Sequence, residues 1–99
     1  MAILTSSLLF NVGTCCFNQQ KWKDAELLYS ETLTISPKYV KAIFKRGMAR
    51  YELGDYEKAM EDIKKSLDFD QSNESIREGY EKVRVKYNEY MKECKIKQK

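Results

Sequence analysis

The sequence contains no histidine, only one proline and only four glycines among its 99 residues. Histidine is the usual side chain for proton transfer near neutral pH and a common metal ligand, so its absence argues against acid–base catalysis. The chain also lacks a nucleophile elbow and a glycine-rich phosphate loop. We therefore expect no enzyme activity and no cofactor. With so little proline and glycine, the composition favours helices over loops.

Cysteine is sparse as well, since Cys15, Cys16 and Cys94 are the only three. Neighbouring residues on a helix point about 100° apart, so Cys15 and Cys16 are poorly placed to pair with each other. A structural zinc ion normally takes four ligands, and the sequence has no C-x-x-C motif. We expect reduced thiols and no metal site.

Long apolar runs are missing too, and none approaches the ~18 residues that a membrane-spanning helix needs. The opening segment, MAILTSSLLF, lacks the basic residues of a secretion signal, and Asn11 interrupts its apolar run. These features predict a cytoplasmic chain without a membrane span.

Charge is abundant but nearly balanced, with a net value of +3. Residues 1–73 carry ten basic and ten acidic side chains, whereas residues 74–99 carry eight and five. A nucleic-acid-binding chain normally shows a denser basic patch, so we expect no nucleic-acid partner. The length allows one small domain.

The clearest pattern is a repeat with a period of 34 residues. Six pairs of similar residues have this separation: Phe10 and Phe44, Gly13 and Gly47, Trp22 and Tyr56, Ala25 and Ala59, Leu33 and Leu67, and Ile35 and Phe69. A 34-residue unit of two helices is typical of tetratricopeptide repeats (TPR). The sequence resembles this family over residues 6–39 and 40–73, which we interpret as two repeats within a region spanning residues 1–73.

Turn and capping residues divide the two repeats into four helices, expected at about residues 3–19, 22–35, 38–53 and 55–69. Asp55 follows Gly54 and is the expected N-cap of the fourth helix. Ser36 and Pro37 are the expected N-cap and first residue of the third helix. Gln20 stands where the second repeat has Gly54.

A further helix is predicted over about residues 73–97, with Ser72 or Asn73 as its N-cap. Its apolar stripe alternates spacings of four and three residues through Ile76, Tyr80, Val83, Tyr87, Tyr90 and Cys94. A helical stack needs such a helix to close its open end, so residues 74–99 are interpreted as a capping helix. The predicted fold class is all-α: a TPR-type superhelix of two helix-turn-helix repeats plus a long C-terminal helix.

The candidate binding residues lie on the third helix. Lys41 and Lys45 are four residues apart and therefore share one face, with Phe44 and Met48 close beside them. Two fixed ammonium groups can form charge-assisted hydrogen bonds with a peptide's terminal carboxylate. Exposed lysines are usually only solvated, which is the alternative interpretation of either lysine alone.

Asn11, followed in the next repeat by Lys41-x-x-x-Lys45, resembles the carboxylate clamp of TPR co-chaperones such as the C-terminal domains of FKBP-type immunophilins. The resemblance implies binding of the acidic Glu-Glu-Val-Asp end of a cytosolic heat-shock chaperone. Asn11 would be a neutral donor, Thr14 would lie on the same groove wall, and Phe44 or Met48 would bound a pocket for the valine.

Two features depart from that family. Its members usually have arginine where Lys45 stands, and the lysine and asparagine of their first clamp repeat have no counterpart in this sequence. Either that repeat lies outside the sequence or the clamp is partial.

Two alternatives remain open. Ile3, Leu4, Leu8 and Val12 lie on the face where a preceding repeat would pack, which favours a self-associating scaffold that forms a homo-oligomer through the N-terminal helix. The basic, amphipathic C-terminal helix could instead bind calmodulin or a membrane surface, although a capping role already explains its apolar stripe.

Overall fold

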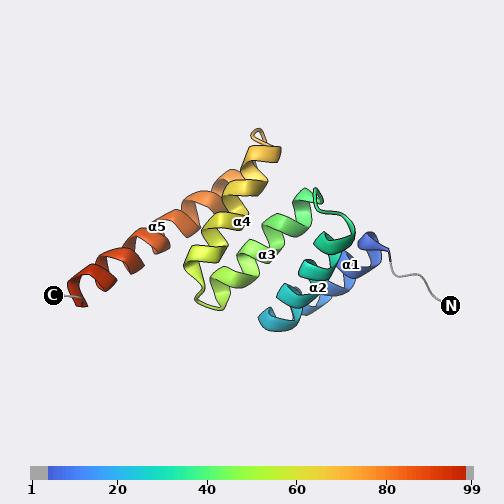
Figure 1. Cartoon of the computed structure of the whole chain (residues 1–99), viewed down its shortest axis with the longest axis horizontal. Helices are drawn as coiled ribbons and strands as arrows, with labels where there is room; N and C mark the ends of the chain where they lie inside the picture. Colours follow the sequence, from blue (N-terminus) through green and yellow to red (C-terminus); the bar gives the residue numbers. More distant parts are fainter. Residues whose placement is uncertain (1–4, 98–99) are drawn as a thin grey trace.

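The computed structural model describes the backbone of residues 5–97 and the side chains of residues 5–93. Five helices follow one another along the chain (Figure 1). They are α1 (Ser6–Asn18), α2 (Trp22–Ile35), α3 (Val40–Glu52), α4 (Tyr56–Phe69) and α5 (Glu74–Lys97). Within this part of the chain there is no strand, so the all-α prediction is confirmed. The first helix, expected over about residues 3–19, begins at Ser6, because Thr5 has an extended backbone and is its N-cap.

Each helix packs against the next, and the stack is elongated, with extents of 57 × 28 × 21 Å (Figure 1). α1 also contacts α3, and α3 contacts α5. These three helices therefore form one wall of the stack, while α2 and α4 form the other.

The repeat predicted from the sequence is visible in the packing. Ala25 and Tyr29 belong to one buried cluster, and Ala59 and Ile63, which lie 34 residues later, belong to the second. The helices of each pair approach closely at a glycine. A Cβ atom on Gly47 would lie only 2.8 Å from Cγ1 of Ile63, so a larger residue would push α3 away from α4.

Two of the three capping predictions agree with the structure. Asp55 caps α4 by accepting a hydrogen bond from the backbone N–H of Lys58 at 3.4 Å. Asn73, rather than Ser72, caps α5, because its Oδ1 accepts from the N–H of Ile76 at 3.3 Å.

The prediction for Ser36 and Pro37 was wrong. α3 begins only at Val40, with Tyr39 as its N-cap, and Pro37 lies in the preceding turn. Ser36 instead ends α2, and its hydroxyl donates a hydrogen bond of 2.9 Å to the hydroxyl of Ser6. Its side chain is therefore used to tie the end of α2 to the start of α1.

The turns inside the two repeats have the same left-handed backbone although their residues differ. Gly54 has a φ of 85°, and Gln20, at the equivalent position of the first repeat, has a φ of 63°. A side chain makes this conformation unfavourable, so Gln20 adopts it at a cost that Gly54 avoids.

α5 covers the end of the stack with its first half. Ile76 and Val83 are buried, and Gly79 lies against the side chains of Phe44 and Met48. Farther along, the helix projects beyond the body (Figure 1), although the rings of Tyr56 and Tyr90 still meet at 5.7 Å. No helix within the described part of the chain has both the length and the apolar character of a membrane span.

Candidate functional site

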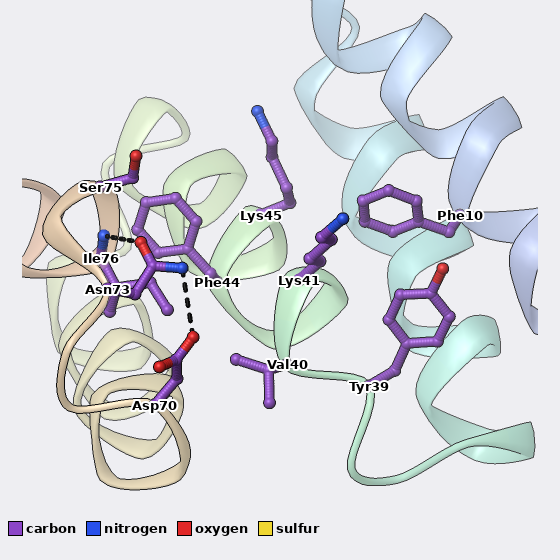
Figure 2. A pocket seen from close by; sticks show the side chains of 10 residues that line it. All are labelled: Phe10, Tyr39, Val40, Lys41, Phe44, Lys45, Asp70, Asn73, Ser75 and Ile76. Atoms are coloured by element: carbon purple, nitrogen blue, oxygen red, sulfur yellow. Dashed lines mark hydrogen bonds between the residues drawn. The ribbon is translucent and has the colours of Figure 1, made fainter.

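The main candidate site is a hollow of about 580 Å³ that opens between α1, the first half of α3 and the start of α5. Figure 2 shows its aromatic side on α1 and the α2–α3 turn, and its opposite side at the α4–α5 turn. The lining residues are Phe10, Tyr39, Val40, Lys41, Phe44, Lys45, Asp70, Asn73, Ser75 and Ile76.

Both predicted lysines line this hollow, as Figure 2 shows. Lys41 is exposed, whereas Lys45 is half-buried because its ammonium group lies over the ring of Phe17, 4.6 Å from the centroid. Neither lysine forms an ion pair with another residue in the described part of the chain. The hollow therefore has two cationic groups that are not paired with any carboxylate whose position the structure describes.

The remaining predicted residues are placed less directly. Phe44 lines the hollow, but Met48 is not among the lining residues and packs in the core against α5. The hydroxyl of Thr14 shares a hydrogen bond of 3.0 Å with the hydroxyl of Tyr29, whose pKa is raised by burial. Asn11 is exposed on α1 and does not line the hollow.

The structure adds residues that the sequence analysis did not select. The rings of Phe10 and Tyr39 stack at 5.2 Å on one side of the hollow, and Ile76 supplies an apolar surface on the other. The 34-residue offset could have indicated Phe10, since it is the counterpart of Phe44. Asp70 is the one carboxylate among the lining residues, and its Oδ2 accepts a hydrogen bond from Asn73 at 3.3 Å.

A network of ion pairs fixes α2, α3 and α4 relative to one another. Asp62 of α4 accepts three hydrogen bonds, from Nε and Nη2 of Arg46 at 3.0 and 2.9 Å and from Nη1 of Arg50 at 2.8 Å. Arg50 also donates to Glu26 of α2 at 2.7 Å. Through these contacts the two arginines of α3 join α2 to α4.

The network also shifts two ionisation equilibria. Burial by itself raises the pKa of Glu26, but hydrogen bonds from Arg50 and Lys23 outweigh it and leave this pKa below its ordinary value. Burial likewise opposes the charge on Arg50, yet its bonds to Glu26 and Asp62 raise the pKa of the guanidinium. Both groups are therefore held in their charged forms.

No cluster of three potential metal ligands (His, Cys, Asp or Glu) occurs among the residues with described side chains. The chemistry available in the hollow is thus that of two ammonium groups, one carboxylate, three aromatic rings, two aliphatic side chains, one amide and one hydroxyl. This combination is suited to binding an anionic group that is joined to an apolar one.

Comparison with known proteins gives a family match over part of the chain. Residues 40–73 match the model of the tetratricopeptide repeat family. Heat shock protein STI1 of Saccharomyces cerevisiae is 33% identical over 76 residues, which are 77% of this chain and 13% of that protein. A mouse FK506-binding protein-like protein is 47% identical over 47 residues, 48% of this chain and 14% of the relative. The chain thus spans about one seventh of these relatives.

Solved structures match a larger share of the chain. The second TPR domain of human RPAP3, in complex with the HSP70 peptide SGPTIEEVD, has a TM-score of 0.77 and 25% identity over 81% of this chain and 67% of that domain. The C-terminal TPR-containing domain of a putative Plasmodium falciparum FK506-binding protein has a TM-score of 0.85 and 31% identity. The match covers 88% of this chain and 58% of that one. The chain therefore has the tetratricopeptide repeat fold, and its residues 40–73 belong to the tetratricopeptide repeat family.

Proposed function

We propose that this chain is a protein-interaction module of a co-chaperone, and that it binds the acidic C-terminal peptide of a heat-shock chaperone. The observation that carries the proposal is the placement of Lys41 and Lys45, which line one hollow and form no ion pair within the described part of the chain. The similarity to an RPAP3 domain that binds the HSP70 peptide, and to STI1, supports this choice of ligand.

The ligand's chemistry fits the hollow. A peptide that ends in aspartate carries two carboxylates close together, and two ammonium groups can donate charge-assisted hydrogen bonds to them. The stacking of Lys45 on Phe17 restricts that side chain before binding, which lowers the entropy lost when the ligand is held. Val40, Phe44 and Ile76 provide an apolar surface for a neighbouring valine.

The other predicted residues take supporting roles in this proposal. Asn11, which is exposed on α1, would donate to a part of the ligand that extends beyond the hollow. Thr14 is bonded to Tyr29 and helps to fix the wall. Met48 supports Phe44 where both lie against Gly79 rather than forming the pocket itself.

Calorimetry with the peptide SGPTIEEVD and its C-terminally amidated form tests the proposal. Because a charge-assisted hydrogen bond contributes about 1.5–3 kcal/mol, we expect the amidated peptide to bind at least ~10-fold more weakly. Lys41→Ala and Lys45→Ala should each remove most of this difference, and added salt should weaken binding of the free acid.

Lys64→Ala is the matched control, since Lys64 is an exposed lysine of α4 that does not line the hollow. It should leave the affinity unchanged. Equal binding of the free and amidated peptides would contradict the proposal.

The same proposal holds that the module works in the cytoplasm and is not itself catalytic.

A self-associating scaffold is the second candidate function. Leu8 and Val12 of α1 are 46% and 43% exposed, although Ile3 and Leu4, which were expected to share this face, lie outside the described residues. Sedimentation should show a dimer at high concentration that Leu8→Glu dissociates. A wild-type chain that stays monomeric would remove this candidate.

A further inference from the structure

Another cationic side chain, in addition to Lys41 and Lys45, lies on the same wall of the stack, on α5. The ammonium group of Lys82 lies over the ring of Tyr51, 5.2 Å from its centroid. Lys82 is exposed and forms no ion pair within the described part of the chain, and the nearby Glu81 pairs with Arg84 at 2.7 Å instead. Its charge is therefore free to meet a ligand.

The contact repeats the arrangement found at the hollow. Tyr51 lies 34 residues after Phe17, and each ring, near the end of its helix, is covered by a lysine from the next helix of the wall. Lys82 itself lies 34 residues after Met48, so α5 continues the series of α1 and α3. Two steps of one wall thus carry a lysine that is positioned by an aromatic ring.

We propose that Lys82 is a second anion-binding position, which binds an acidic side chain upstream of the peptide's C-terminal carboxylate. This inference rests on the function proposed above for Lys41 and Lys45. It makes the ligand an acidic peptide that is recognised at two points, at its terminus in the hollow and again beside α5.

Helix geometry indicates which peptide residue reaches Lys82. Gly79 lies against Phe44 and Met48, level with Lys45, and Lys82 is three residues farther along α5. Three residues correspond to about 4.5 Å along a helix, and neighbouring helix axes are about 9 Å apart. The resulting separation of about 10 Å equals three residues of extended peptide. In SGPTIEEVD this selects the glutamate three positions before the terminal aspartate.

The ordinary interpretation is that Lys82 is a solvated residue of an exposed helix face. The two interpretations differ in one measurable way. Only if Lys82 contacts the peptide does the effect of Lys82→Ala on affinity depend on which peptide residue is acidic. Calorimetry should therefore compare SGPTIEEVD with SGPTIAEVD and SGPTIEAVD, against the wild-type chain and Lys82→Ala.

Relative to the wild-type chain, we expect Lys82→Ala to bind SGPTIEEVD about twofold to fivefold more weakly, the usual range for an exposed ion pair. The same substitution should leave the affinity for SGPTIAEVD unchanged. It should weaken binding of SGPTIEAVD by the same factor as binding of SGPTIEEVD. Lys92→Ala, on another face of α5, controls for the loss of one positive charge and should have no effect.

A loss of equal size with SGPTIEEVD and SGPTIAEVD, or no loss with either, would overturn the assignment of Lys82. This failure is distinct from failure of the proposed function, which is measured by the ratio of free to amidated peptide affinity. That ratio should remain unchanged in Lys82→Ala, because the terminal carboxylate is held by Lys41 and Lys45.

Discussion

Replacing Asp62 tests how much the ion-pair network between α2, α3 and α4 stabilises the folded chain. The Asp62 side chain is only 7% exposed and accepts hydrogen bonds from Arg46 and Arg50, which are 21% and 17% exposed. Asp62→Ala leaves Arg50 with Glu26 as its partner, but Arg46 retains only a long contact of 3.4 Å to the hydroxyl of Ser30. One largely buried guanidinium therefore loses its carboxylate.

Removing one member of a buried ion pair costs about 3–5 kcal/mol, and the surviving contact of Arg50 places the expected cost near ~3 kcal/mol. A small domain has a total free energy of unfolding of about 5–15 kcal/mol, so this loss is large. At roughly 4–8 °C per kcal/mol, the melting temperature should fall by about 12–24 °C.

Urea unfolding, followed by Trp22 fluorescence and by circular dichroism, measures the change. Glu81→Ala is the control, because it breaks the exposed pair with Arg84 and should leave the midpoint where it is. A cost below about 1 kcal/mol for Asp62→Ala would refute the reasoning, since it would mean that water already satisfies Arg46 in the folded chain.

Two further predictions concern stability. Gln20→Gly should raise the free energy of unfolding by about 0.5–1 kcal/mol in urea titrations, because Gln20 has a φ of 63° that glycine adopts without strain; a decrease would contradict this. The pKa of Glu26 is lower in the folded chain than its ordinary value of 4.5, so its stabilisation should be present above pH 4.5 and lost as the pH falls through the folded-state value. The free energies of unfolding of the wild type and Glu26→Gln, measured at several pH values, should therefore differ less in acid. A difference that does not change with pH would exclude the effect.

Much of the fold follows from the sequence because the repeat is encoded by residues that act locally or in pairs. Gly13 and Gly47 mark the close contacts between consecutive helices, and Asp55 caps the helix that follows it directly in the sequence. Ser36 shows the limit of such reasoning. Its sequence context is that of a helix N-cap, but its hydroxyl is taken by Ser6, 30 residues away, and no local pattern reports that contact.

For the candidate site, too, the sequence predicted local features but not contacts between distant residues. Helical spacing correctly placed Lys41 and Lys45 on one face, but it could not say which neighbour covers Phe44 and Met48. Those side chains meet Gly79 of α5, a helix that the repeat analysis treated only as a cap. Carrying the 34-residue offset past residue 73 would have aligned Lys82 with Met48 and indicated that α5 belongs to the wall.

The unequal lengths of the last two helices have a consequence for how the chain loses its structure. α4 has 14 residues and α5 has 24, and every side chain described from Asn88 onward is exposed. Contacts of side chains in this segment include the ring contact between Tyr56 and Tyr90 and an exposed ion pair between Lys86 and Glu89 at 3.8 Å, and neither buries the backbone amides. They should exchange with deuterium long before those around Val83, so that warming unwinds this segment while the peptide-binding wall is still intact.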